Sequence, residues 1–491
     1  MTTPVSPAVT KSSSRLVSQW NPEDSSWDHS LAWKTLWTTT FSLFLGFMVW
    51  YLVSSLAPML QNAPTSLAAA DGTPINILNK SQAFWLAAMP GLAGGTLRLI
   101  WMFLPPILGT RRMVLWSTIA LILPMLGWGW VLTTTPETLH NSFGLLIFLA
   151  LLTGIGGGIF SGYMPSTSYF FPKKRQGVAL GLQAGLGNFG VSVVQLLTPI
   201  LVGWGIFGAA KQVNAKKDAD GKFLQHLVYL QTPAAFIIVL LIISAVLVWI
   251  FLKSVPIKAN FKQQIDIFGN KHTWLMTLIY LLTFGCFSGL AGVFALMLNN
   301  MVVHVPTVAW LGGTTIAFLG AFIGSMARVA WGPFCDKFGG GIWTVVSAVG
   351  IGLSCVIVII ALNGTKVIDP SQIAAGQVAH CEVPLGLFLT GMLLLFFFAG
   401  VGNASTFKQM PMIFPPRQAG GVIGWTAAIA AFGPFIFSVA MNLLTGAGTG
   451  AASGNFGQQI IPVFIVVLIL AIVCAVVAWM FYARKNAPAK S

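Results

Sequence analysis

Three basic residues lie in stretches of this 491-residue sequence that are otherwise apolar or small: Arg98, Arg328 and Lys408. The 11 Asp and Glu residues all fall in predicted loops, tails or helix ends, so no carboxylate is predicted to pair with these cations. If the stretches cross a membrane, an Arg at the bilayer centre costs about 2.5–3.5 kcal/mol and normally faces a partner or a water-filled cavity. We therefore expect a soluble anion to be that partner.

The two Arg residues suit a small planar oxyanion better than a Lys does. A guanidinium presents a flat fork of N–H donors, whereas a Lys ammonium is a rotatable point charge. Gly and Ala residues stand near Arg98 and Arg328, which leaves room for a small ligand and little for a bulky one. We expect the two to bind an anion from two sides. The alternative is that each donates to backbone carbonyl groups or extends to the membrane surface.

The elements that must position these residues are membrane-spanning helices. Hydrophobic residues make up 56% of the chain and charged residues only 8%, a composition typical of membrane proteins and not of soluble enzymes. A helix needs about 20 apolar residues to cross a bilayer. The predicted fold class is an all-α membrane protein with twelve transmembrane helices. They are residues 37–59, 82–106, 113–133, 142–171, 177–207, 233–252, 273–300, 307–333, 342–362, 384–413, 419–446 and 458–482.

The charge distribution predicts the orientation of the chain. The net charge of +15 is compatible with nucleic-acid binding, but the basic residues follow the positive-inside bias of cytoplasmic loops instead. With both termini in the cytoplasm, 17 of the 26 Lys and Arg residues lie in inner segments and six in outer loops. We expect an integral protein of the cytoplasmic (inner) membrane that binds no nucleic acid. Its predicted parts are a cytoplasmic N-terminal segment (1–36), an N-terminal six-helix bundle (37–252), a cytoplasmic linker (253–272), a C-terminal six-helix bundle (273–482) and a cytoplasmic tail (483–491).

An internal repeat relates the two predicted bundles. The segments GGTLRLIWMFLPPILG (94–109) and GSMARVAWGPFCDKFG (324–339) each carry Gly four residues before the Arg and Gly eleven residues after it. FPKKRQGVALG (171–181) matches FPPRQAGGVIG (414–424) with one inserted residue. Two six-helix halves with such matches are typical of secondary transporters, which hold the substrate near the membrane midplane where the halves meet. The two Arg residues are then counterparts in the two halves.

Several segments resemble the nitrate/nitrite porters of the major facilitator superfamily, the NarK-type proteins. The resemblance covers almost the full length and is carried by WNPEDSSW (20–27), GLAGGTLR (91–98), AGLGNFGVSVVQ (184–195), YLLTFGCFSG (280–289) and AGVGNASTFKQMPMIFP (399–415). It implies the major facilitator fold of two pseudo-symmetric six-helix bundles. It also implies a transporter, not an enzyme, that moves nitrate and nitrite by alternating access. In the loop pattern GPFCDKFGG (332–340), the resemblance makes Asp336 and Lys337 part of a cytoplasmic gate.

The same resemblance assigns the residues of the anion site. Two Arg residues would contact nitrate or nitrite, four aromatic residues would exclude water from it, and one Asn would supply a polar contact. The matching positions are Arg98, Arg328, Tyr280, Phe284, Phe160, Phe47 and Asn188. Without the family match, each aromatic residue is expected to be ordinary core or lipid-facing packing, and the Asn fits a hydrogen bond between helices as well as a ligand contact.

Two coupling mechanisms are open. In nitrate/nitrite exchange, the two uncompensated Arg residues repel each other and hold the empty transporter until an anion binds. In proton–nitrate symport, Lys408 of STFKQMP would carry the proton. The alternative for Lys408 is a static third cation.

Alternative functions are transport of formate or an organic acid, or a non-transporting membrane sensor. We expect a monomer. We expect no metal or other cofactor, because the five Cys residues are scattered and form no metal-ligand spacing. Residues 20–37 are expected either to lie along the inner membrane surface or to be a solvated tail.

Overall fold

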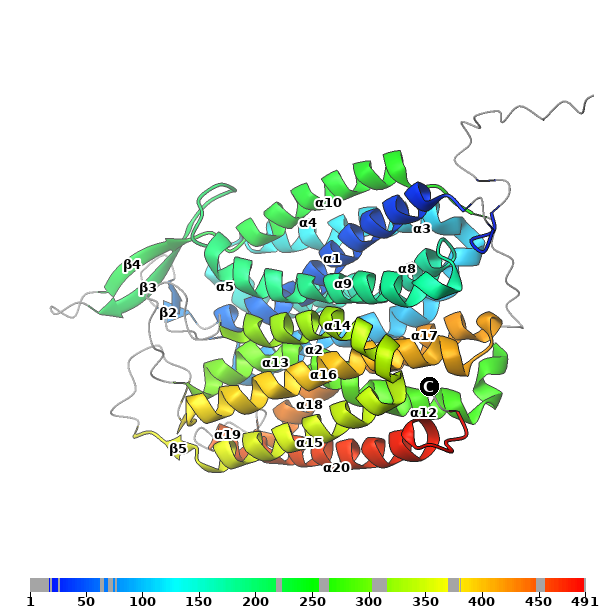
Figure 1. The fold of residues 1–491 in the computed structure, drawn as a ribbon. Coiled ribbons are helices and arrows are strands. Elements are labelled where there is room, and N and C mark those ends of the chain that lie inside the picture. Colours follow the sequence, from blue (N-terminus) through cyan, green and yellow to red (C-terminus); the bar gives the residue numbers. More distant parts are fainter. Residues whose placement is uncertain are drawn as a thin grey trace, which may run out of the picture.

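Twelve long apolar helices form most of the described part of the structure (Figure 1). The structure is a computed structural model that describes residues 17, 20–24, 27–61, 66–68, 74–75, 77–217, 223–255, 265–302, 316–369, 379, 381–446 and 455–489. Each of the twelve helices has at least 18 residues and is apolar enough to cross a bilayer. The predicted fold class, an all-helical membrane protein with twelve spans, is therefore confirmed.

The first six spans run from α1 to α10. The third span is interrupted at Leu121 between α3 and α4, and the fourth consists of α6, α7 and α8 with a one-residue interruption at Gly154 and at Ile159. The bounds are α1 (His29–Leu60), α2 (Lys80–Trp101), α3 (Leu104–Ala120), α4 (Ile122–Val131), the short α5 (Pro136–Asn141), α6 (Phe143–Thr153), α7 (Ile155–Gly158), α8 (Phe160–Ser168), α9 (Lys173–Leu201) and α10 (Thr232–Phe251).

The second six spans run from α12 to α20. The seventh span contains a π-helical turn, η2 (Leu281–Gly285), between α12 and α13, and such turns are frequent at functional sites. The other bounds are η1 (Asp266–Gly269), α12 (Lys271–Tyr280), α13 (Cys286–Met301), α14 (Phe318–Phe338), α15 (Gly340–Asn363), α16 (Leu385–Ile413), α17 (Pro416–Ala430), α18 (Gly433–Leu444), α19 (Phe456–Gln459), α20 (Ile461–Ala478) and η5 (Trp479–Ala483).

One end of the helical bundle carries a small antiparallel sheet with the strand order β2-β1-β3-β4. Its strands belong to the connections between the first and second spans and between the fifth and sixth. We call this end the sheet end, and the opposite end, where α1 begins and α20 ends, the terminal end (Figure 1). The strand bounds are β1 (Ser66–Ala68), β2 (Pro74–Ile75), β3 (Lys211–Lys217) and β4 (Phe223–Val228), with a separate pair of β5 (Lys366–Val367) and β6 (Cys381–Glu382).

Some predicted helix boundaries differ from the structure. α9 ends at Leu201, six residues before the predicted end, and α14 continues to Phe338, five residues beyond it. Gly339 ends α14 because its φ of 88° departs from the helical backbone. Residues 307–315 of the predicted eighth span and 256–264 of the predicted linker lie outside the described residues.

α1 begins at His29 and not at residue 37, because the Asp28 carboxylate caps it by accepting from the Leu31 amide at 2.9 Å. The last residues of the predicted cytoplasmic segment 1–36 are thus helical. This cap extends the first helix by two turns at the terminal end.

The described residues before α1 pack against the connection between α8 and α9. The indole N–H groups of Trp20 and Trp27 donate to the carbonyl oxygens of Tyr169 and Phe170, each at 2.8 Å. The Glu23 carboxylate accepts from the first amide of α9 at 2.8 Å, a position where the helix dipole favours a negative charge. The solvated-tail alternative is therefore wrong for these residues.

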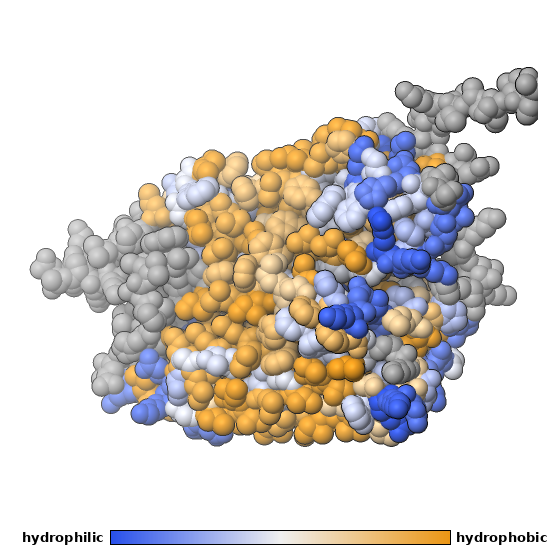
Figure 2. Space-filling model, in the orientation of Figure 1, coloured by the Kyte–Doolittle hydropathy of each residue, from blue (hydrophilic) through white to orange (hydrophobic). Residues whose placement is uncertain are grey.

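The surface between the two ends is apolar. Figure 2 shows a broad hydrophobic band across the helices and hydrophilic residues gathered toward the terminal end. Large apolar side chains of the spans are more than half exposed, as in Trp116, Trp130, Phe148, Leu353 and Val466. A soluble protein rarely exposes so large an apolar area, whereas a lipid bilayer covers it.

Candidate functional site

The structure brings Arg98 and Arg328 to the interface between the two halves. Arg98 is on α2, which packs on α17 and α18, and Arg328 is on α14, which packs on α9. Their side chains are 0% and 1% exposed, and the two guanidinium groups are near enough to interact electrostatically. We call these two residues the arginine pair. The fold thus places two like charges together in its interior.

Arg98 has protein acceptors for two of its three guanidinium nitrogens. Nε donates to the Gly157 carbonyl at 2.8 Å, and Nη1 donates to the Ala427 carbonyl at 2.6 Å. Gly157 is on α7 in the first half and Ala427 is on α17 in the second, so Arg98 links the halves. Its Nη2 has no partner among the described residues. The alternative in which a buried Arg donates to backbone carbonyls therefore describes Arg98 only in part.

None of the three nitrogens of Arg328 has an acceptor in hydrogen-bonding geometry within the described part of the chain, although the Tyr280 hydroxyl lies close to the guanidinium. The ring of Phe407 lies 4.6 Å from its guanidinium carbon. Such a cation–π contact is worth about 0.5–2 kcal/mol, whereas each unsatisfied buried donor costs about 1–3 kcal/mol. Arg328 therefore has more N–H groups without an acceptor than Arg98, in which only Nη2 lacks one.

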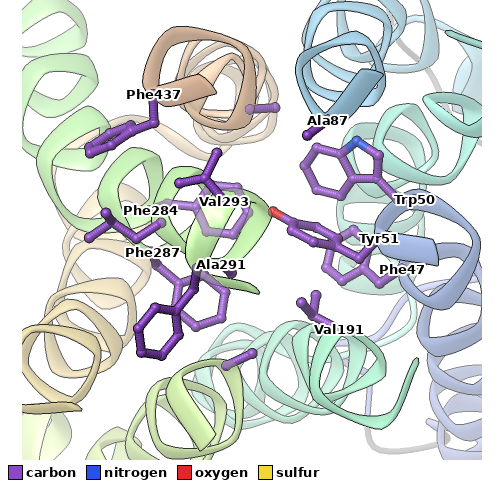
Figure 3. Close-up of a cluster of buried hydrophobic side chains, with 14 of the residues drawn as sticks. Phe47, Trp50, Tyr51, Ala87, Val191, Phe284, Phe287, Ala291, Val293 and Phe437 are labelled. Carbon is purple, nitrogen blue, oxygen red and sulfur yellow. The ribbon is translucent and has the colours of Figure 1, made fainter. Parts of the chain in front are cut away.

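Aromatic rings surround the guanidinium of Arg98. Its carbon lies 4.6 Å from the ring of Phe160, 5.1 Å from Phe284 and 5.3 Å from Trp50. Phe47 stacks on Phe160 with 6.0 Å between ring centroids. Figure 3 shows that Phe47 and Trp50 project from α1 toward the half that carries Phe284. These rings exclude water, and a water-poor surrounding strengthens the interaction between charges.

One hydroxyl and two amides add polar groups to this interior. The Tyr280 ring stacks on Phe284 with 5.3 Å between centroids, and its hydroxyl interacts electrostatically with both members of the arginine pair. Asn188 is 1% exposed and Asn403 is 0% exposed. All four amide atoms have no hydrogen-bond partner among the described residues, and the Tyr280 hydroxyl has none in good geometry, with Arg328 as its nearest charged neighbour. The interior therefore contains donors and acceptors that the described protein does not satisfy.

Lys408 has different surroundings. Its ammonium forms an ion pair with Asp336, and the two side chains are 31% and 40% exposed. The prediction of a Lys buried beside other cations is therefore wrong for this conformation, as is the expectation that no carboxylate pairs with it. The reason is that α14 continues past its predicted end and brings Asp336 alongside α16. Lys337 lies exposed, with its ammonium 5.2 Å from the ring centroid of Phe338.

The sequence repeat has a counterpart in the backbone. Gly109 and Gly339, eleven residues after each Arg, have φ of 72° and 88° and ψ of 158° and 141°. Only Gly adopts this conformation readily. Gly94 and Gly324, four residues before each Arg, lie where a Cβ would come within 2.8 Å and 2.6 Å of an aromatic side chain. Both arginines thus follow a close helix contact and precede a Gly-dependent turn.

Three residues of this interior are not among those predicted from the sequence: Trp50, Phe407 and Asn403. Trp50 follows Phe47 by three residues, so the two share one face of α1. Phe407 is in the STFKQMP segment, and Asn403 ends GVGN (400–403), which repeats the GLGN (185–188) that ends at Asn188. Helical spacing and this four-residue repeat are the signals that point to them.

Known proteins resemble the chain over most of its length. The family model described as Major Facilitator Superfamily matches residues 39–376. The chain is 47% identical to the probable nitrate/nitrite antiporter NarK2 of Thermus thermophilus, over 96% of this chain and 97% of that protein. It is 31% identical to the nitrate/nitrite transporter NarU of Escherichia coli (strain K12), over 97% and 98% of the two chains. The crystal structure of a D-xylose-proton symporter matches with a TM-score of 0.60 and 14% identity, over 93% and 98% of the two chains, and shows the fold alone.

Proposed function

Because this chain belongs to the Major Facilitator Superfamily and, within it, to the family of nitrate/nitrite transporters, we propose that it carries nitrate and nitrite across the cytoplasmic membrane as a secondary active transporter. The observation that carries this proposal is the arginine pair, two buried cations from opposite halves with N–H groups that no described residue accepts. A small anion would accept hydrogen bonds from these N–H groups and would offset the repulsion between Arg98 and Arg328. Nitrate and nitrite are planar, as the guanidinium group is.

Anion binding then releases the two halves for movement. Without the anion, two like charges repel each other in a low-dielectric interior. The bond from Arg98 to the Ala427 carbonyl meanwhile holds the halves together. An anion between the two arginines lowers the energy of every conformation in which both contact it. The halves can then rock around the site, as in other transporters built from two repeats.

The coupling that we propose is exchange of nitrate for nitrite. Exchange requires only that the loaded carrier moves and the empty carrier does not. Proton symport requires a group that takes up and releases a proton in step with the anion, and Lys408 is the candidate. Lys408 has Asp336 as its counter-ion and is about a third exposed. It therefore lacks the uncompensated burial that would make a Lys lose its proton in the empty carrier and regain it when an anion binds.

The proposed orientation places the terminal end in the cytoplasm. Hydrophilic residues gather there (Figure 2), and the excess of Lys and Arg in the predicted inner segments agrees with the positive-inside bias. Segments 1–36, 253–272 and 483–491 are then cytoplasmic. The proposed functional unit is a monomer, because one chain supplies both members of the arginine pair.

Flux into proteoliposomes of the purified full chain tests substrate and coupling together. Vesicles loaded with nitrite should take up labelled nitrate faster than vesicles loaded with chloride, at equal pH on both sides. An acid-outside gradient alone should drive no uptake, formate should not compete, and Lys408→Gln should retain the exchange.

Two results would contradict these proposals in different ways. Uptake driven by the acid gradient into chloride-loaded vesicles, and lost in Lys408→Gln, would establish symport and leave the substrate intact. Formate transport without nitrate or nitrite flux would contradict the proposed substrate itself.

A further inference from the structure

We propose that Asn403 of α16 is a second amide contact for the anion, on the opposite side of Arg328 from Asn188. This inference rests on the proposed function and adds a residue that determines affinity at the same site. Three observations carry it: the position of Asn403 relative to Arg328, its buried amide without partners, and its repetition of the Asn188 motif.

The contacts between α14 and α16 place Asn403 at the level of Arg328. A Cβ on Gly400 would collide with the Gly324 carbonyl, so the two helices touch there. Farther along both helices, the Phe407 ring lies 4.6 Å from the Arg328 guanidinium carbon. Asn403 is three residues after the first contact and four before the second, and residues at these spacings share one helix face. Asn403 therefore faces α14 between the two contacts.

The amide of Asn403 differs from the polar groups next to it. The Thr406 hydroxyl donates to the Gly402 carbonyl at 2.8 Å, and the Ser405 hydroxyl bonds to the Thr344 hydroxyl at 2.7 Å. Both amide atoms of Asn403 have no partner among the described residues, although the side chain is 0% exposed. Buried polar groups in native structures nearly always have a partner, so this amide indicates one that is not a described residue.

Asn188 occupies the matching place on the other side of α14. It ends the segment GLGN on α9, as Asn403 ends GVGN on α16. Gly185, three residues before Asn188, contacts Val329, the residue after Arg328. α14 thus lies between two helices that each bring a partnerless buried amide toward the level of Arg328.

A neutral amide suits this place for an electrostatic reason. Nitrate has three oxygen atoms that accept hydrogen bonds, and the amide NH₂ group of Asn403 donates to one of them. The amide oxygen of Asn403 has no donor among the described residues, so in this conformation nothing competes with the anion for the orientation of the amide. A Lys or Arg here would add a third positive charge and increase the repulsion in the empty protein. Asn403 therefore raises the affinity for an oxyanion without that cost.

Thermal unfolding of the purified full chain at increasing nitrate concentration tests this contact, because the rise in Tm gives an apparent Kd. Asn403→Ala should raise the Kd about tenfold, the loss expected for one hydrogen bond to a charged ligand. Asn403→Asp has nearly the same size, lacks the donor and repels the anion, so it should raise the Kd further. Asn442→Ala is the matched control, since Asn442 is another buried amide, near the end of α18. The Kd of this variant for nitrate should equal that of the wild type.

An unchanged Kd in Asn403→Ala, with a wild-type Tm in the absence of nitrate, would overturn the inference. If Asn403→Ala does not fold, Asn403→Asp serves in its place, and an unchanged Kd there overturns it equally. If nitrate and nitrite produce no rise in the Tm of the wild-type protein, the proposed function fails, which separates that outcome from a failure of the Asn403 contact alone.

Discussion

At the residue scale, the two arginines occupy matching positions of the repeat but have different partners. Arg98 donates to carbonyl oxygens in both halves, at 2.8 and 2.6 Å, whereas no nitrogen of Arg328 has an acceptor in the described part of the chain. A guanidinium reaches several acceptors in fixed directions, which a Lys ammonium cannot reproduce. We therefore assign Arg328 mainly to anion binding, and Arg98 both to binding and to the link between the halves.

Lysine substitutions should separate these two roles. Arg328→Lys is expected to raise the KM for nitrate at least about tenfold with a smaller effect on kcat, because it removes donors that bind the anion. Arg98→Lys should also change kcat, because it removes the bond between the halves. Initial rates of nitrate/nitrite exchange in proteoliposomes with equal protein content measure both quantities.

Arg484→Lys, an exposed residue after η5, is the control for the same chemical change and should keep the wild-type rates. Near-normal KM values in both Arg98→Lys and Arg328→Lys would refute anion binding by the arginine pair.

At the element scale, a Gly with positive φ follows each Arg-bearing stretch. Gly339 joins α14 directly to α15, with φ of 88° and ψ of 141°. Residues with a Cβ are strained in this region by about 1–3 kcal/mol. The turn also sets where α14 ends, and the last turn of α14 carries Asp336, the partner of Lys408. The backbone conformation of Gly339 therefore determines the position of the Asp336 carboxylate, and with it the ion pair to Lys408.

Gly339→Ala should lower the Tm of the purified protein by about 1–3 °C, because Ala does not adopt this backbone conformation without strain. Gly332→Ala is the matched control on the same helix. No atom lies within 4 Å of a Cβ added there, and its backbone is helical, so its Tm should equal or slightly exceed that of the wild type. Equal Tm values for the two variants would contradict the strain argument.

At the scale of the whole molecule, several hydrogen bonds between the halves lie on the sheet-end side of the arginine pair, in addition to the bonds from Arg98 to the Ala427 carbonyl and from Ser161 to the Gly424 carbonyl. The Tyr51 hydroxyl donates to the Ser288 carbonyl at 2.9 Å, and the Gln195 amide donates to the Ala291 carbonyl at 2.8 Å. Figure 3 shows the Tyr51 hydroxyl pointing across to the helix that carries Ala291 and Val293. Close to the end of α1, the Gln61 amide bonds to the Asn300 amide at 3.3 Å. The structure is therefore closed at the sheet end.

Tyr51→Phe should make the sheet end open more often, because it removes one of these bonds and keeps the ring. Ala87→Cys reports the opening, since Ala87 and Tyr51 line the same small cavity. In the double variant, a membrane-impermeant thiol reagent added from the sheet end should label the new Cys faster than in Ala87→Cys alone.

The parent protein without the added Cys is the control for this labelling, since its five cysteines are free and buried. Equal labelling rates in the single and double variants would show that the Tyr51 bond does not hold the sheet end closed.

The sequence by itself determined the twelve spans, the relation between the halves and the identity of the two buried arginines. These follow from local properties: the length of an apolar stretch, the cost of a charge within it, and the spacing of Gly around it. The same spacing also predicts two matching Gly positions, which the structure shows as two matching turns at Gly109 and Gly339.

Only the tertiary structure decided what each cation meets. The bond from Arg98 to Ala427 joins residues 329 positions apart, and the ion pair of Lys408 with Asp336 depends on where α14 ends and how it lies beside α16. Asn403 stands out only when its burial and its lack of partners are known. Each of these depends on how helices distant in sequence pack together, and the apolar patterns that predict the helices do not specify that packing.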